Sequence, residues 1–170
     1  DPYGGKKDLD HQILRQVFQN AFMEDPLRLL RAIQLSARFN LKIEQDTLAH
    51  MAKHASLITS VSEERIVQEI QKLMLADQPS IGFDLMRETG LLHYLFPFIE
   101  KMIGILQPRK KNEDVYQHTM KVLNAARHAP EIQKAGDIDL MFAALFHDVG
   151  KPKTYRLDPQ TNETTFYGHQ

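Results

Sequence analysis

The helical spacing of the apolar residues constrains the fold of this chain more than any other feature of its sequence. In the segment EDPLRLLRAIQLSARF, apolar side chains recur three or four positions apart, at Leu27, Leu30, Ile33 and Ala37. Asp25 and Pro26 stand directly before this series, and a capping side chain followed by proline at the first helical position is typical of a helix start. The sequence therefore predicts an amphipathic helix that begins at Asp25.

A second helix is predicted in the segment SVSEERIVQEIQKLML. Ser60 and Glu63 have the spacing of a capping box, and the apolar face that follows consists of Ile66, Ile70, Leu73 and Met74. Further helical patterns, separated by glycine and proline, cover residues 8–20, 44–55, 79–88, 91–106, 113–129 and 137–148. Strand signal is nearly absent apart from TTFY near the end. The predicted fold class is all-α.

Two modules are expected, because a soft boundary separates two groups of helices. At residues 107–112, Pro108 precedes the basic triplet Arg109, Lys110 and Lys111. We expect one module at residues 1–107 and the start of another at residues 108–170. The triplet is interpreted as a solvated linker in preference to a binding site. The chain opens without Met and closes without a terminating signal, which leads us to expect a piece of a longer protein.

The composition limits the chemistry that the chain can support. None of the 170 residues is cysteine, which excludes disulfides and thiolate metal sites, so any metal must be held by carboxylates and the eight histidines. Lys and Arg (21) nearly balance Asp and Glu (22), so any contacts with RNA are expected to be local. The longest apolar run, residues 140–146, is too short to span a bilayer, and no signal peptide opens the chain. We therefore expect a cytoplasmic protein without a membrane partner.

The strongest chemical motif is LMFAALFHDVGKP, an apolar helix that ends in adjacent His147 and Asp148. At a helix end the backbone is free to bring both side chains onto one cation. His118 on the preceding helix is a third candidate ligand and His169 a fourth. Imidazole and carboxylate ligands suit Mn, Fe, Ni, Co or Zn, and a metal with open positions fits phosphoester hydrolysis. The plainer alternative is that His147 and Asp148 form a helix cap and a hydrogen-bonded pair.

A second group of polar residues, Glu24, Asp25 and Arg28, stands at the start of the first predicted helix. A carboxylate accepts hydrogen bonds and a guanidinium donates them. Cytosine and adenine each present an amino donor beside a ring-nitrogen acceptor, so one Asp–Arg pair can complement both, whereas uracil and guanine present the opposite pattern. The alternative is that Asp25 only caps the helix and forms a surface salt bridge with Arg28, worth less than about 1 kcal/mol.

Arg65 and Glu69 form a further pair, four residues apart on the second predicted helix. Spacing of this kind is common in exposed helical ion pairs, which is one interpretation. The functional alternative is that both side chains brace the first helix in its orientation.

The order of these motifs resembles a known family. EDPLRLLRAIQLSARF followed by ERIVQEIQKLM is similar to the neck of class II tRNA nucleotidyltransferases, the CCA-adding enzymes, and of the related bacterial poly(A) polymerases. The family's base-reading motif falls on Glu24, Asp25 and Arg28, and its supporting motif on Arg65 and Glu69. The opening DPYGGKKDL resembles the strand and turn that close the family's catalytic head. The resemblance implies a helical neck/body in which Asp25 and Arg28 select CTP and ATP.

The same resemblance extends to the second module. His118, the HDVGKP segment and His169 resemble the HD superfamily of metal-dependent phosphohydrolases, and a C-terminal HD domain occurs in one bacterial branch of the CCA-adding enzymes. The resemblance implies tRNA as a partner, Mg²⁺ with head carboxylates for nucleotide transfer, and a divalent transition metal in the HD module. It further implies an HD domain truncated before its last Asp ligand, with phosphoesters, including terminal 2′,3′-cyclic phosphates, as substrates.

Three other functions are compatible with these residues. A poly(A) polymerase carries the same neck motifs. A free-standing HD phosphohydrolase would use the N-terminal helices only as a scaffold. A helical RNA-binding module without catalytic activity is the third alternative.

Overall fold

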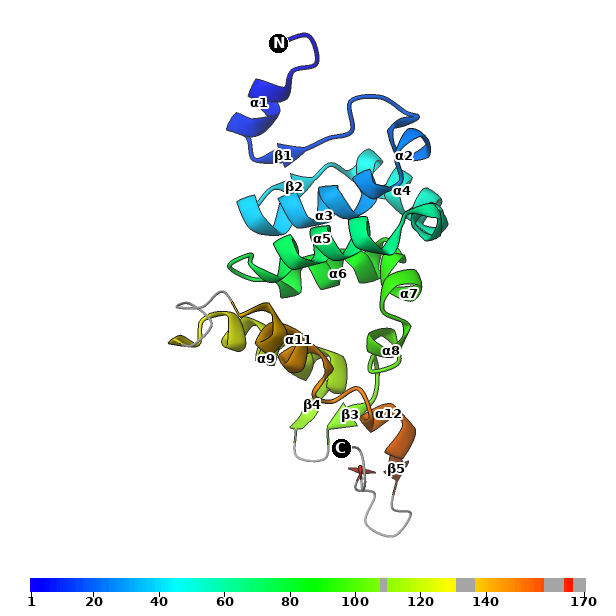
Figure 1. Cartoon of the computed structure of the whole chain (residues 1–170), viewed down its shortest axis with the longest axis vertical. Helices are drawn as coiled ribbons and strands as arrows, with labels where there is room; N and C mark the ends of the chain where they lie inside the picture. Colours follow the sequence, from blue (N-terminus) through cyan, green and yellow to red (C-terminus); the bar gives the residue numbers. More distant parts are fainter. Residues whose placement is uncertain (108–109, 131–136, 158–163, 167–170) are drawn as a thin grey trace. The chain divides into compact units, whose positions relative to one another are not determined.

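The computed structural model describes residues 1–107, 110–130, 137–157 and 164–166. These residues form two compact units, Asp1–Leu95 and Phe96–Gln170 (Figure 1). Helices dominate both units, and the strands of the described residues pair only two at a time, which confirms the all-α prediction. The module boundary expected after residue 107 remains a prediction. Within the described residues, no helix has both the length and the apolar character needed to cross a membrane.

The first unit is a set of helices joined by short turns and one parallel strand pair. In chain order its elements are α1 (Gly5–Asp10), β1 (Ile13–Leu14), α2 (Ala21–Glu24), α3 (Leu27–Phe39), β2 (Lys42–Ile43), α4 (Gln45–His54), the 3₁₀ helix η1 (Ala55–Ser60), α5 (Glu63–Met74), α6 (Ser80–Glu88) and α7 (Leu91–Leu95).

Helix α3 lies at the centre of the first unit and packs against α5 and α6. Its predicted apolar face is buried at Leu27, Leu30, Ile33 and Ala37. The facing helices bury Leu73 and Met74 from α5 and Phe83 and Met86 from α6. Burial of this apolar face holds α3 in place, while its opposite face remains available for polar side chains.

The helix predicted at residues 8–20 is wrong. Helix α1 ends at Asp10, and Gln12 follows in the left-handed region with φ 56°. Ile13 and Leu14 then pair in parallel with Lys42 and Ile43. The Lys42 amide donates to the Gln12 carbonyl at 2.8 Å. Long-range backbone pairing overrides the local helical spacing here, and a strand of two residues is too short to show a period of its own.

Two further predicted boundaries need correction. Ser60 does not cap α5: its Oγ donates to the Leu57 carbonyl at 2.8 Å within η1, and the residue at the N-cap of α5 is Ser62, with extended backbone. The single helix predicted at residues 91–106 is broken in the structure. Helix α7 ends at Leu95, and Pro97, which has no N–H to continue a helix, occupies the first position of α8.

The second unit is built on two helices that pack against each other. Over the residues that the structure describes, its elements are α8 (Pro97–Glu100), β3 (Leu106–Gln107), β4 (Lys110–Asp114), α9 (Val115–Arg127), α11 (Ile138–Phe146), α12 (Lys151–Thr154), β5 (Arg156–Leu157) and β6 (Thr164–Thr165). A capping box of Asp114 and Gln117 opens α9, and the Asp137 side chain caps α11. Strand β6 lies in the TTFY segment that carried the only strand signal in the sequence.

Candidate functional site

Asp25 occupies the turn between α2 and α3. Its backbone is extended (φ −142°, ψ 96°), the Pro26 backbone is already helical, and the Leu27 amide donates to Asp25 Oδ1 at 3.3 Å. The predicted helix start is therefore confirmed. The Asp25 carboxylate also accepts from Arg65 Nη2, at 3.2 Å to Oδ1 and 3.3 Å to Oδ2. Asp25 is thus held on two sides while it remains partly exposed.

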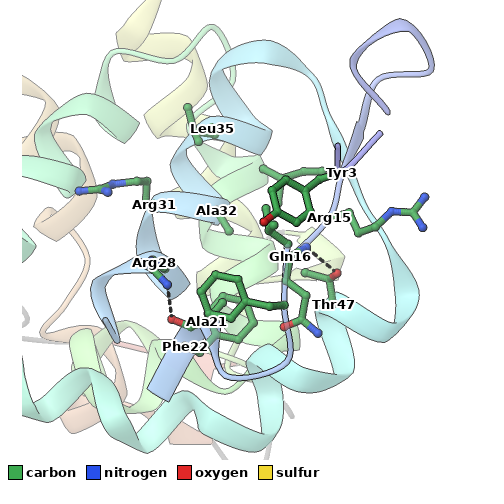
Figure 2. A pocket seen from close by; sticks show the side chains of 13 residues that line it. Tyr3, Arg15, Gln16, Ala21, Phe22, Arg28, Arg31, Ala32, Leu35 and Thr47 are labelled. Carbon is green, nitrogen blue, oxygen red and sulfur yellow. Dashed lines mark hydrogen bonds between the residues drawn. The ribbon is translucent and has the colours of Figure 1, made fainter. Parts of the chain in front are cut away.

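Arg28 is the second residue of α3, and its side chain folds back toward α2. Arg28 Nη1 donates to the Ala21 carbonyl at 3.0 Å (Figure 2) and to Glu24 Oε2 at 3.4 Å. Its guanidinium carbon lies 5.5 Å from the centre of the Phe18 ring. In the structure Arg28 therefore pairs with Glu24, and Asp25 pairs with Arg65. The alternative interpretation, in which Asp25 forms a surface salt bridge with Arg28, is therefore wrong.

A largely apolar cavity of about 460 Å³ lies beside α3. Phe18, Phe22, Ala32 and Leu35 contribute to its wall. Arg28 and Arg31 also line it, although the guanidinium of Arg31 points away from the cavity (Figure 2). On the opposite wall, the backbone N–H of Gln16 donates to Thr47 Oγ1 at 3.1 Å (Figure 2). Arg28 thus combines a polar partner on α2 with an apolar cavity, the kind of surface against which a flat ring can lie.

Arg65 and Glu69 both extend from α5 toward α3 instead of pairing with each other. Arg65 engages Asp25 at the start of α3, and Glu69 Oε1 lies 3.8 Å from Arg31 Nε, farther along that helix. Lys72 Nζ donates to the same Glu69 oxygen at 2.8 Å. The Glu69 side chain is only 4% exposed. The interpretation of Arg65 and Glu69 as an exposed ion pair is therefore wrong.

His118, His147 and Asp148 lie together in the second unit. Their ligand atoms are all within 4.8 Å of one another. Asp148 Oδ2 is 3.1 Å from His147 Nε2 and 3.8 Å from His118 Nε2. His118 comes from the middle of α9, whereas His147 and Asp148 follow the last turn of α11, where the chain leaves the helix. His169, the fourth predicted ligand, lies outside the described residues.

The chemistry of this cluster suits a divalent metal ion. His147 Nδ1 lies 2.8 Å from the Ala144 carbonyl, so the Nδ1–H tautomer directs the free Nε2 toward Asp148. Two imidazole nitrogens and one carboxylate form a ligand set for transition metals, with positions left for water or substrate. Asp148 is buried, and its Oδ2 faces both imidazoles. The three residues therefore fit a metal.

Lys151 is a neighbour of this cluster that was not among the residues predicted from the sequence. Its Nζ donates to Asp148 Oδ2 at 2.7 Å. The signal was present in HDVGKP, because a lysine three residues after Asp148 reaches back across one helical turn. Arg31 and Lys72, which engage Glu69, were missed in the same way.

Two protein families match consecutive parts of the chain, in the order that the sequence motifs predict. A family described as "Probable RNA and SrmB- binding site of polymerase A" matches residues 40–103, and the family described as "HD domain" matches residues 115–170. The Multifunctional CCA protein of Nitrosococcus oceani is 38% identical over 176 residues, which cover 99% of this chain. This chain is homologous to a segment of the multifunctional CCA proteins. It covers 40% of that relative's length.

Other known proteins agree with this relationship. The Multifunctional CCA protein of Haemophilus influenzae is also 38% identical, over 100% of this chain and 42% of its own length. A solved structure titled "tRNA-processing enzyme (apo form 2)" matches with a TM-score of 0.62 at 24% identity, over 86% of this chain and 39% of that one. A solved structure of a tRNA nucleotidyltransferase complexed with a primer tRNA and an incoming ATP analog matches with a TM-score of 0.60 at 24% identity. The match covers 85% of this chain and 40% of that one. The solved structures support the fold.

Proposed function

We propose that this chain supplies the base-selecting neck and the HD module of a CCA-adding tRNA nucleotidyltransferase. Asp25 and Arg28 select CTP and ATP, which are added to the 3′ end of tRNA. The observation that carries this proposal is the position of the partly exposed Asp25 at the start of α3, where Arg65 holds it, with Arg28 on the same helical turn. The identity to multifunctional CCA proteins along the whole chain supports it.

The remaining hydrogen-bonding capacity of the pair matches cytosine and adenine. Within the described part of the chain, Arg28 uses only Nη1 for its bonds to Ala21 and Glu24, so its Nε and Nη2 hydrogens are left as donors. Among the residues that the structure describes, Asp25 Oδ2 accepts only from Arg65, which leaves it a lone pair for a further bond. The carboxylate is then the acceptor for the amino group of the base, and the guanidinium is the donor to its ring nitrogen.

Arg65 and Glu69 act as positioning residues in this proposal. Arg65 fixes the Asp25 carboxylate, and Glu69 engages Arg31 beside the cavity that Arg28 also lines. A reading group that is held before the base arrives loses less entropy when it binds. This pairing across two helices favours a bracing role. Transfer itself, with Mg²⁺, is assigned to a catalytic head outside these 170 residues.

The HD module is proposed to hold a divalent metal at His118, His147 and Asp148. Such a metal supplies a site that binds phosphoryl oxygens and makes bound water more acidic, the chemistry of phosphoester hydrolysis. The protein side chains fix the position of that site, and the burial of Asp148 limits the access of water to its carboxylate. Terminal 2′,3′-cyclic phosphates are the proposed substrate class. Ni, Mn, Co, Fe and Zn are the candidate ions, with His169 as a further proposed ligand.

The base-selection proposal is tested in a nucleotidyltransferase whose chain includes these residues. Asp25→Ala and Arg28→Ala are each expected to reduce the preference for CTP and ATP over UTP and GTP. Nucleotide incorporation at the tRNA 3′ end is the measurement. Unchanged selectivity in both variants would show that the pair is only structural.

A poly(A) polymerase is the second candidate, and one observation favours it. The family that matches residues 40–103 is described as a binding site of polymerase A. The two functions differ in the use of CTP, because a poly(A) polymerase adds only adenylate. Incorporation of CTP into a tRNA lacking its CCA end would exclude the polymerase, and incorporation of ATP alone would favour it.

A further inference from the structure

Lys151 makes a buried ion pair with the carboxylate at the centre of the proposed metal site. Its Nζ lies 2.7 Å from Asp148 Oδ2, and the two side chains are 13% and 5% exposed. The neighbouring Lys153 on the same short helix is exposed. The ammonium group of Lys151 is therefore buried within the site, whereas most lysines keep this group in water.

Other side chains hold the Lys151 ammonium in this place. Gln107 Oε1 accepts from Lys151 Nζ at 3.3 Å, and the Phe166 ring centre lies 5.4 Å from that nitrogen. The three contacts come from β3, from the end of α11 and from the residue after β6. Contacts from three separate segments fix the ammonium beside Asp148.

The oxygen that Lys151 binds is also the one that faces both histidines. Asp148 Oδ2 is 3.1 Å from His147 Nε2 and 3.8 Å from His118 Nε2. An ion bound by both imidazoles and this carboxylate would therefore use Oδ2. A lysine ammonium and a divalent cation repel each other strongly at such short range, most of all where water is largely excluded.

We propose that Lys151 competes with the divalent metal for Asp148 Oδ2 and thereby sets the metal affinity of the HD module. The inference rests on the proposed metal site. To admit the metal, the ammonium has to leave Oδ2, and Gln107 and Phe166 keep it close when it does. The affinity of the site for the metal is thus lower than His118, His147 and Asp148 alone would give. A higher metal concentration is therefore needed to fill the site.

Isothermal titration calorimetry of the whole chain with NiCl₂ or MnCl₂ at constant pH tests the competition between Lys151 and the metal. Lys151→Met removes the ammonium and keeps the aliphatic stem, so its Kd is expected to fall about tenfold or more, equivalent to about 1.4 kcal/mol. Lys151→Gln is a second neutral variant with the same expected direction. Lys153→Met is the matched control, and its Kd should equal that of the wild type.

Thermal unfolding gives a second readout that does not depend on catalysis. In EDTA, Lys151→Met should melt below the wild type, because the buried Asp148 loses its ammonium partner. Added Ni²⁺ should then raise the melting temperature of the variant more than that of the wild type, since tighter binding stabilises the folded state more.

The possible results separate the two proposals. If the wild type binds metal through His147 but Lys151→Met and Lys151→Gln bind with equal or weaker affinity, the competition is refuted and the metal site stands. If neither the wild type nor any variant binds Ni²⁺ or Mn²⁺, the metal site itself is refuted and the competition with it.

Discussion

Arg65 Nη2 donates to both carboxylate oxygens of Asp25, at 3.2 Å and 3.3 Å, although the two residues are 40 positions apart in the chain. The bond joins α5 to the turn that begins α3. It holds the carboxylate proposed to accept the amino group of an incoming base. Any change that frees Asp25 should therefore affect nucleotide choice before it affects folding.

Arg65→Ala is expected to lower discrimination between CTP and UTP while leaving stability nearly unchanged. An exposed ion pair contributes less than about 1 kcal/mol to the free energy of unfolding, so the melting temperature should move little. Incorporation kinetics with each nucleotide, beside a thermal melt, provide the measurement. Glu64→Ala, at the exposed neighbouring position, is the control and should behave as wild type. A fall in stability with unchanged nucleotide preference would assign Arg65 a purely structural role.

Glu69→Gln should separate stability from activity. The Glu69 side chain is 4% exposed, and within the described residues its Oε2 is buried without a hydrogen-bond partner. Removing a buried charge recovers desolvation energy while it weakens the pairs with Arg31 and Lys72, so stability should change by less than about 1 kcal/mol. The kcat/KM for CTP and ATP should nevertheless fall. Denaturant unfolding and incorporation kinetics measured together decide this, and a large loss of stability would refute the bracing role.

His147→Ala is expected to abolish most metal binding by the HD module. The variant loses one of the three described ligands and keeps only His118 and Asp148. Elemental analysis of the purified chain after loading with Ni²⁺ or Mn²⁺ is the measurement. His128→Ala, a change at an exposed histidine of the same unit, should retain its metal. Equal metal content in His147→Ala and the wild type would make His147 a structural residue.

Gly82→Ala tests the packing between α6, which carries Gly82, and α5, which carries Leu73. A Cβ at position 82 would collide with the side chain of Leu73, which is fully buried and has little room to move. Alanine favours a helix by about 1 kcal/mol over glycine, but overpacking typically costs about 1–3 kcal/mol. A net loss of stability is expected in denaturant unfolding, and a stabilised variant would show that α5 and α6 are packed loosely.

The sequence predicted best what local periodicity encodes. Helices α3 and α5 carry long amphipathic patterns, and both form with the expected faces buried, except that Ile66 at the start of the α5 face is only half-buried. The strands β1 and β2 could not be predicted, because two residues show no period and their pairing depends on a partner far along the chain. For the same reason the segment after α1 looked helical.

In the candidate sites too, contacts set by local sequence were predictable and contacts between distant segments were not. His147 and Asp148 are neighbours at a helix end, so their meeting with His118 was predictable from the order of the helices. The partner of Asp25 was not, because spacing within one helix suggests Arg28, while the observed partner lies on α5. Such contacts between helices depend on tertiary packing, which a single sequence does not show.

The central claim, that Asp25 reads the base, is tested most directly by Asp25→Asn. Asparagine still caps a helix, but its amide adds a donor where the carboxylate only accepts, so uracil is no longer rejected. The quantity to measure is the ratio of kcat/KM for CTP to that for UTP, in a nucleotidyltransferase that includes this chain, with Glu64→Gln, the loss of an exposed carboxylate on α5, as the control. The ratio is expected to fall about tenfold or more in Asp25→Asn and to stay unchanged in Glu64→Gln. An unchanged ratio in Asp25→Asn would contradict it.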